Sequence, residues 1–483
     1  MTRLLQTRRV FVFILALGLF TMGARGVADP DVWWHLRTGQ LILQNHSVFH
    51  TDPYSFTRFG QPWVNHEWLS EILIFGLYRV SGFGGLIVGF AIVIATTLLL
   101  VFIRCPGRPY LAALMTLWGA IASAPTWGVR PQMLSLLLAS IFLIVLEAST
   151  QRPNLLWWTA PLMFLWVNLH AGYAIGLALL ALFLVGEALE AGASGQWRKT
   201  APRIKRLTLV FAVCLALVPL NPHGLRIYGY PFDTLRSPAM HSFIQEWFSP
   251  DFHDPMYAPL LLMLLTLIAG LALSPRPPRV RDLVLLLVMI PAALRSVRHV
   301  PILMLVLIPV LAQLSEAWLR QRGAARLLTM GRTEPSPRAV RVNVVVLATF
   351  AAFTLVRIRH VVNTQGATEA QHFPAAAVAF LNREHPPAPV LNHYNWGGYF
   401  IWKLYPQYRV FADGRADVYG DQFMATFGTS YYLTDDWTKP IQLWGIRTVV
   451  LPPDAPLITA LRYAPEWRQI YADSKAIILT RPR

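Results

Sequence analysis

Long apolar runs, separated by short polar segments, constrain this chain more than any other feature of its sequence. A helix that crosses a bilayer needs about 20 mostly apolar residues, with about 17 as a lower bound. The chain is 55% hydrophobic and only 14% charged, so we predict a polytopic membrane protein that is mainly α-helical. The membrane-spanning helices, about 11 in all, are expected near residues 9–26, 84–103, 109–125, 131–148, 154–170, 172–190, 205–220, 256–273, 281–296, 299–319 and 340–357.

The distribution of charge predicts the orientation of these helices. A net charge of +17 would suggest a nucleic-acid partner in a soluble protein. Here most basic residues lie in short loops, at 104–108, 198–206, 276–281 and 320–341. Such an excess of Lys and Arg is typical of cytoplasmic loops. We therefore expect no nucleic-acid partner and a multi-pass protein of the cytoplasmic (inner) membrane, with its N-terminus in the cytoplasm and the chain after about residue 360 outside.

The N-terminus has two interpretations. Arg3, Arg8 and Arg9, followed by the apolar stretch 10–22, also resemble a cleavable signal peptide. Because further spans follow, we favour an uncleaved signal-anchor. On either interpretation the chain after Ala28 is delivered to the extracytoplasmic side.

Two extracytoplasmic segments are long enough to build a site. We expect a transmembrane domain over residues 1–360, within which residues 27–83 form a long first loop. Amphipathic stretches at 31–44 and 67–80, rich in aromatic residues, suit helices in the headgroup layer. Residues 366–483 are predicted to form a small α/β domain.

Alternating elements in this tail favour a sheet covered by helices. Helix-like segments are expected at Pro374–Glu384, Tyr399–Leu404 and Lys439–Trp444, and strand-like segments at Val390–Tyr394, Arg409–Asp413, Thr448–Leu451, Gln469–Tyr471 and Ala476–Thr480.

The segment Asp29-Pro30-Asp31-Val32-Trp33-Trp34-His35 directly follows the first apolar span. Carboxylates are costly inside a bilayer but not at its surface, so a cluster there can bind a charged substrate or a metal ion. A structural interpretation stays open, in which Asp29 is an N-cap with Pro30 at the first helical position.

Other polar motifs fall on the same predicted side of the membrane, mostly at span ends. Together they would form a polar substrate-binding surface at the outer ends of the spans. Each residue alone could instead cap a helix or extend its charged end from the membrane to the water. Arg295 and Arg298 break the positive-inside pattern, and arginine at such a place is suited to hold a phosphate through forked hydrogen bonds. The candidate substrate-binding residues are His35, His66, Arg130, Asn168, His170, His223, Glu246, Arg295, Arg298 and His299.

Carboxylates opposite arginines at a membrane surface suggest a lipid-phosphate-linked substrate. The arginines would hold the phosphate leaving group while a carboxylate deprotonates an acceptor hydroxyl. Asp29 or Asp31 is the expected catalytic base, with Glu67 as an alternative base or metal ligand. Mg²⁺ or Mn²⁺ could bind such oxygen donors, but the spacing is no defined metal motif, so a metal requirement stays open.

The first membrane helix, the acidic start of the long outer loop, about a dozen spans and an outer tail domain resemble the C-type (GT-C) glycosyltransferase superfamily. The motifs Asp29 to His35, Pro62 to Trp68, Asn168-Leu169-His170, Trp396 to Tyr399 and Asp413-Gly414-Arg415 are similar to a poorly characterised bacterial group within it. The resemblance covers most of the chain. It implies a catalytic or metal-binding acid at Asp29 or Asp31.

The tail motifs have two interpretations. Asp413 ends a predicted strand, where ligands of open α/β sheets usually bind, so Asp413 and Arg415 are candidate substrate-binding residues. Alternatively, they pair with each other and brace the turn. The tail lacks the motif of two tryptophans and an aspartate of oligosaccharyltransferases, which disfavours glycan transfer to asparagine.

The leading hypothesis is a membrane glycosyltransferase. It would move a sugar from a polyprenyl-phosphate-linked donor to an envelope glycan, lipid or protein on the extracytoplasmic face. The alternatives are a ligase or polymerase of lipid-linked glycans, and a non-enzymatic transporter or flippase. A transporter should carry charges deep in mid-span, near broken helices. Because most charges here lie near span ends, we favour the enzyme.

Overall fold

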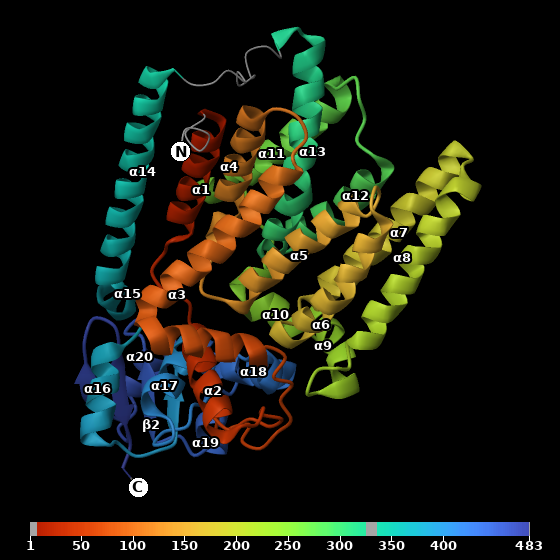
Figure 1. The fold of residues 1–483 in the computed structure, drawn as a ribbon. Helices are drawn as coiled ribbons and strands as arrows, with labels where there is room; N and C mark the ends of the chain where they lie inside the picture. The colour runs from red at the N-terminus through yellow and green to blue at the C-terminus, as the bar shows by residue number, and fades with distance from the viewer. Residues whose placement is uncertain (1–6, 325–335, 483) are drawn as a thin grey trace. The chain divides into compact units, whose positions relative to one another are not determined.

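Helices make up most of the structure, and each expected membrane span corresponds to one of them (Figure 1). The computed structural model describes residues 7–324 and 336–482. Arg3 and part of the basic segment 320–341 lie outside the described residues. The span helices are α1 (Thr7–Gly23), α3 (Trp68–Arg104), α4 (Pro109–Ser123), α5 (Pro131–Ala148), α6 (Thr159–Leu169), α7 (Tyr173–Ser194), α8 (Trp197–Leu217), α11 (Ala258–Leu273), α12 (Val280–Arg295), α13 (Val300–Gln321) and α14 (Pro337–Asn363).

By length and composition alone, the described residues include six helical segments able to cross a membrane. The fold class expected from the sequence, a polytopic helical bundle with a small α/β tail, is thereby confirmed. The six segments are Trp68–Arg104, Pro131–Ala148, Tyr173–Ser194, Pro255–Leu273, Val297–Gln321 and Pro337–Asn363.

Helix α3 joins two elements that the sequence predicts separately, the amphipathic stretch 67–80 and the span 84–103. Ser81 and Gly82 interrupt it with non-helical backbone angles. Gly82 has φ +57° and ψ −152°, a region open to glycine and strained for residues with a Cβ. This single position therefore lets the first loop run directly into the second span.

Backbone contacts divide the chain into two units, which we describe separately. The transmembrane unit comprises Met1–Arg25, Ile87–Leu220 and Glu246–Val362. The loop–tail unit comprises Gly26–Leu86, Asn221–Gln245 and Asn363–Arg483. The first loop thus belongs with the tail, although more than 270 residues of chain separate them.

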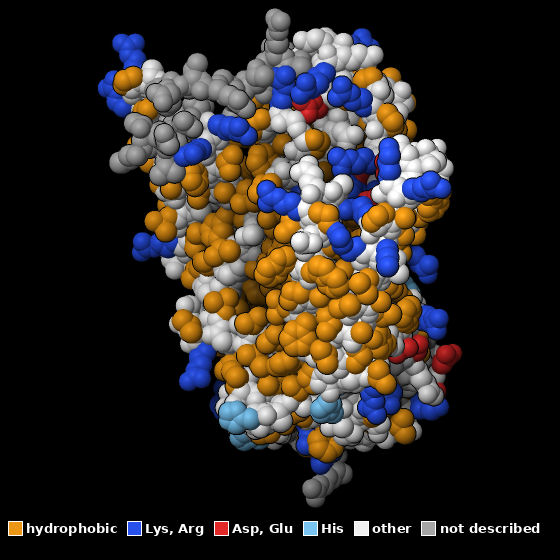
Figure 2. Space-filling view, turned by 45° about the vertical axis from the view of Figure 1, so that its right-hand side comes forward, with side chains coloured by type: hydrophobic (Ala, Val, Ile, Leu, Met, Phe, Trp, Pro, Cys, Tyr) orange, Lys and Arg blue, Asp and Glu red, His pale blue; other side chains and the backbone are white. Residues whose placement is uncertain are grey.

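In the transmembrane unit, α13 is the central helix. It packs on α4, α11 and α12, and most of its side chains from Val300 to Ala317 are buried. Helices α11 and α14 instead expose most of their apolar side chains. Figure 2 shows exposed apolar side chains gathered over a broad area of one face. This pattern suits helices that lie against lipid.

The tail sheet has four strands in the order β1-β2-β4-β3. Strand β1 pairs with β2 in parallel, with Val390 opposite Thr448, and the other pairs are antiparallel. The strands are β1 (Val390–Asn392), β2 (Thr448–Leu451), β3 (Arg468–Ala472) and β4 (Ile477–Thr480).

Several helices accompany this sheet. The expected helices are present as α16 (Ala375–Glu384), α17 (Gly397–Leu404) and α19 (Lys439–Leu443). Helix α2 (Val32–Asn45) of the first loop packs on α17. The helices that we did not predict are α9 (Tyr230–Arg236), α10 (Pro238–Phe243), α15 (Gln365–His372), α18 (Ala416–Tyr432) and α20 (Pro456–Arg462).

The predicted strand at Arg409–Asp413 is wrong. This segment joins no strand of the sheet, and its backbone is paired elsewhere. The Val410 N–H donates to Tyr54 O over 3.1 Å, and Val410 O accepts the Phe56 N–H over 3.1 Å. The side chain of Asn392 bonds to Phe411 N and Ala412 O over 2.8 Å each. The backbone of the segment is therefore bonded by the first loop and by the side chain of Asn392 at the end of β1, and it pairs with no strand as a fifth strand of the sheet.

Candidate active site

The first acidic residues lie in a turn just before helix α2. That helix begins at Val32, so Asp29 lies two residues before its N-cap and the capping alternative for Asp29 is wrong. Instead, the Asp29 Oδ1 atom accepts the backbone N–H of Asp31 over 2.8 Å. The Asp31 Oδ1 atom accepts the indole N–H of Trp34 over 3.2 Å. The hydrogen bond from Trp34 holds Asp31 in place. Both carboxylates are partly exposed, so Asp31 also stays accessible to a substrate.

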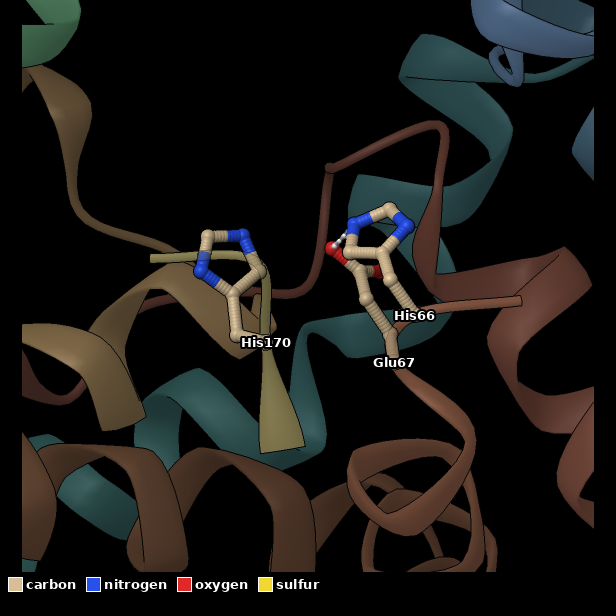
Figure 3. Close-up of side chains that lie close together, drawn as sticks. All are labelled: His66, Glu67 and His170. Carbon is tan, nitrogen blue, oxygen red and sulfur yellow. Dashed lines mark hydrogen bonds and ion pairs between the residues drawn. The ribbon is translucent and has the colours of Figure 1, made fainter. Parts of the chain in front are cut away.

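A row of titratable side chains extends from α2 into α3. The Nε2 atom of His35 lies 3.4 Å from Glu67 Oε2, and its Nδ1 atom lies 3.7 Å from Glu71 Oε1. Glu67 Oε1 is 3.0 Å from Nε2 of His66, the contact marked in Figure 3. Asn65 donates to Glu71 over 2.8 Å. Glu71, which sequence analysis did not single out, lies one helical turn after Glu67 and so on the same face.

The environment of His66 favours its charged form. The ring Nδ1 faces the Val64 carbonyl at 3.3 Å, which can only accept, so Nδ1 carries a proton. Burial lowers the pKa of His66, but the Glu67 carboxylate more than offsets this and the pKa lies above its ordinary value. The ring of Tyr230 lies against that of His66, tilted by 34° with 4.0 Å between centroids. The Glu67 carboxylate and the Val64 carbonyl therefore both favour the protonated form of the His66 ring.

His223 behaves in the opposite way. Burial and the neighbouring His50, whose ring centroid lies 4.8 Å away, lower the pKa of His223 to about 4. The Asn221 side chain accepts the His223 backbone N–H over 3.0 Å and fixes this turn. At neutral pH His223 is uncharged and can both donate and accept a hydrogen bond.

Asp413 and Arg415 form an ion pair within the tail. The Nε and Nη2 atoms of Arg415 donate to the two Asp413 oxygens over 2.8 and 2.7 Å. Tyr419 donates to Asp413 over 2.7 Å, and Asp52 of the first loop lies 2.8 Å from Arg415 Nη2. Burial lowers the pKa of Arg415, yet Asp413 and Asp52 raise it well above its ordinary value. Arg415 therefore stays charged although it is buried.

Asp417, the second residue of α18, adds a carboxylate to this unit that was not among the predicted site residues. Although the Asp417 residue reaches solvent, the protein packed around its carboxyl group raises the pKa of that group above its ordinary value, and the charges of His66 and Arg415 oppose the rise. A carboxyl group that holds its proton more tightly than usual can exchange it with a substrate. Its place two residues after Arg415 is the only sequence signal that could have identified it.

In the transmembrane unit, Arg130 and Glu246 form an ion pair. The backbone carbonyl of Glu246 also accepts a hydrogen bond from Ser296 over 2.8 Å. Arg298 lies over the Trp247 ring, 5.4 Å from its centroid, and His299 contacts the same ring at 6.1 Å. The segment around Glu246 therefore brings together Arg130, Arg298 and His299. Arg295 lies at the C-terminal end of α12 with an exposed side chain.

Asn168 and His170, at the end of α6, both make hydrogen bonds within the transmembrane unit. Asn168 donates to Phe164 O over 2.9 Å. The Nδ1 atom of His170 accepts the Gly172 N–H over 2.9 Å and lies 2.8 Å from Ser135 Oγ. Because Nδ1 accepts, the ring proton lies on Nε2. His170, also drawn in Figure 3, thus has a fixed orientation and tautomer.

Two kinds of donor in the loop–tail unit could hold a divalent cation. Asp29 and Asp31 supply carboxylate oxygens, which Mg²⁺ and Mn²⁺ prefer. The Glu67 oxygens face the imidazoles of His35 and His66. The ligand atoms of His66 and Glu67 lie within 4.8 Å of one another, close enough to hold one metal ion.

Comparisons with known proteins identify the fold. No family model matches the sequence, and no curated protein matches it. The structure is similar to ArnT from Cupriavidus metallidurans, solved with undecaprenyl phosphate bound, with TM-score 0.51, 14% identity and coverage of 99% of this chain and 100% of ArnT. It is also similar to the oligosaccharyltransferase of Archaeoglobus fulgidus in its apo form, with TM-score 0.52, 11% identity and coverage of 92% and 70%.

A second structure of the archaeal enzyme, AglB in complex with an inhibitory peptide and a dolichol-phosphate, gives TM-score 0.52 at 10% identity, covering 98% of this chain and 74% of AglB. The chain has the fold of the C-type glycosyltransferases. At these identities the likeness establishes the C-type glycosyltransferase fold and not a substrate.

Proposed function

We propose that the protein transfers a sugar from a polyprenyl-phosphate-linked donor to an envelope acceptor, which is a glycan, a lipid or a protein. The observation that carries the proposal is the Asp31 carboxylate, held by Trp34 and partly exposed directly after the first membrane helix. The similarity to ArnT bound to undecaprenyl phosphate supports a lipid-phosphate donor.

In the proposed reaction, Asp31 accepts the proton of an acceptor hydroxyl. The acceptor oxygen forms a bond to the anomeric carbon of the sugar as the bond from that carbon to the phosphate oxygen breaks. The polyprenyl phosphate leaves with the bonding electrons, and a positioned cation stabilises its charge. Within the transmembrane unit, Arg298, whose forked guanidinium lies over Trp247, is the residue that the sequence favours for binding a phosphate.

The proposed orientation follows from the basic loops, which we place in the cytoplasm. Both the first loop and the tail then lie outside, on the same side as Arg298. The contact of α2 with α17 supports this placement, because two packed elements must share a compartment. The reaction would therefore take place at the extracytoplasmic face.

Deleting the gene tests the function. Mass spectrometry of envelope glycans should show the loss of one sugar and an increase in one polyprenyl-phosphate sugar. Detergent-solubilised protein, supplied with donor and acceptor extracted from the deletion strain, should restore the product. A ligase or polymerase would instead transfer a longer preassembled glycan. A transporter needs two compartments and would give no product in detergent, a result that would refute the enzyme.

Arg298→Lys tests the proposed phosphate site. Lysine keeps the charge but loses the fork, so we expect the KM for donor to rise about 10-fold, the equivalent of about 1.4 kcal/mol. The matched control is Arg322→Lys, since Arg322 also lies over a tryptophan, 5.7 Å from the centroid of Trp318, at the other end of α13. The control should leave the KM unchanged. Equal changes in the KM for donor in the two variants would show that Arg298 does not bind the donor phosphate.

A further inference from the structure

The turn Asp413-Gly414-Arg415 of the tail reaches directly into the first loop. Arg415 is buried, with 1% of its side-chain surface exposed. Its guanidinium lies 4.6 Å from the centroid of the Trp63 ring and 4.9 Å from that of Tyr54. The Nη2 atom also bonds to Asp52 over 2.8 Å. One tail side chain thus contacts two aromatic rings and one carboxylate of the first loop.

Asp52 itself organises the loop around it. Its carboxylate accepts the backbone N–H groups of Tyr54 over 3.0 Å and Ser55 over 3.1 Å. The Asp52 backbone bonds to Gln61 and Gly60 over 2.9 Å each, which closes the turn. Arg415 is therefore paired with the residue about which this part of the loop folds.

The middle residue of the tail turn lies against the candidate base. A Cβ atom added at Gly414 would overlap the Asp31 Oδ1 atom and come within 3.0 Å of Asp31 Cγ. A Cβ added at Gly398 would overlap the Pro30 carbonyl oxygen. Both glycines therefore let the tail approach the acidic turn at van der Waals distance.

We propose that the turn Asp413-Gly414-Arg415 is a positioning element for the reaction: Arg415 anchors the first loop through Asp52, and Gly414 sets the position of the Asp31 carboxylate. This inference rests on the proposed function and deepens it, since it assigns the tail a part in turnover. These residues act through Asp31 and need not touch the substrate. A displacement of about 1 Å in a catalytic group can reduce turnover about 10²-fold.

Gly414→Ala in the full-length protein tests the proposal. The added methyl group meets the end of a side chain that can move, not the backbone, so the fold should survive while Asp31 shifts. We expect kcat to fall about 10²-fold, with the KM for donor within about twofold. Gly366→Ala is the matched control, because a Cβ there meets nothing within 4 Å and the helical alanine is favourable. Its kcat should stay at the wild-type value.

A double-variant cycle distinguishes positioning from general damage. If Gly414 acts through the Asp31 carboxylate, Gly414→Ala should have little further effect on kcat in an Asp31→Asn background. Independent, multiplying losses would overturn the proposal, as would a Gly414→Ala protein that behaves like Gly366→Ala. Full activity of Asp31→Asn alone would instead refute the proposed mechanism, which keeps the two failures distinguishable.

Arg415→Lys provides a second test that does not depend on Gly414. Lysine keeps the charge between Asp413 and Asp52 but cannot make the forked contacts. We expect kcat per folded protein to fall about 10-fold, while the KM for donor changes little. Wild-type kcat in this variant would overturn the anchoring role of Arg415.

Discussion

Asp31→Asn is expected to insert and fold like the wild-type protein and to lose turnover by about 10²-fold or more. The amide oxygen of asparagine can still accept the Trp34 hydrogen bond seen at Asp31 Oδ1, so the geometry before α2 should persist. The amide cannot take a proton from an acceptor hydroxyl. The expected loss is therefore confined to kcat, measured with solubilised protein and extracted donor and acceptor.

Companion variants define which acid acts. Asp251→Asn is a control of identical chemistry on an exposed loop residue and should change nothing. Glu67→Gln separates the remaining roles, because a metal ligand would show weakened activity restored by added Mg²⁺ or Mn²⁺, whereas a base would not be restored. If Asp31→Asn, Asp29→Asn and Glu67→Gln were each fully active, the catalytic base would not lie in the first loop.

Asp52→Asn should destabilise the protein by about 1.5–3 kcal/mol, because it weakens the charge-assisted contact of Asp52 with the buried Arg415, which keeps its ion pair with Asp413. Both side chains of this pair are at most 1% exposed. The control is Glu384→Gln, which breaks a surface pair with Arg383 whose side chains are 69% and 49% exposed. That variant should cost less than about 1 kcal/mol. Thermal unfolding in detergent measures both, and equal shifts would contradict the anchoring of the first loop by Arg415.

The pH dependence of stability follows from the same groups. Burial would raise the pKa of Asp52, but Arg415 and the hydrogen bonds of Ser55 and Tyr54 hold it below its ordinary value of 3.8. This stabilisation is complete above about pH 4 and is lost as the pH falls through the folded-state pKa. The pKa of His66 is raised, so its contribution is complete below about pH 6.5 and is lost as the pH rises through the folded value. The unfolding temperature should therefore be highest between these two pH limits. In the Asp52→Asn variant, the unfolding temperature should fall less steeply as the pH is lowered below about 4.

Parts of the tail could be predicted from the sequence because local patterns determine them. Strand β2 has the predicted bounds Thr448–Leu451, and its apolar residues are buried on both faces of the sheet. The segment Arg409–Asp413 has a similar pattern but lies against the first loop, a choice that depends on a distant partner. Helix α18 was missed since Gly420, with φ +73°, interrupts it and obscures its period.

Within the candidate site, the sequence identified residues but not their partners. Asp29 and Asp31 could be singled out by their place after an apolar span. Asp52 was not among the candidate site residues, and its ion pair with Arg415 joins positions that are 363 residues apart in the chain.

The sequence by itself determined the polytopic membrane character, the positions of the long apolar helices, most of the tail sheet and the acidic start of the first loop. These follow from hydropathy and from side-chain periodicity, which act over a few turns of chain. Only the tertiary structure decided that the first loop and the tail form one unit, that Arg415 pairs with Asp52 and that Gly414 lies against Asp31. Such contacts depend on side-chain packing between segments that are distant in the chain. One buried ion pair, or the absence of one Cβ, decides how those segments meet, and no pattern in the local sequence predicts that contact.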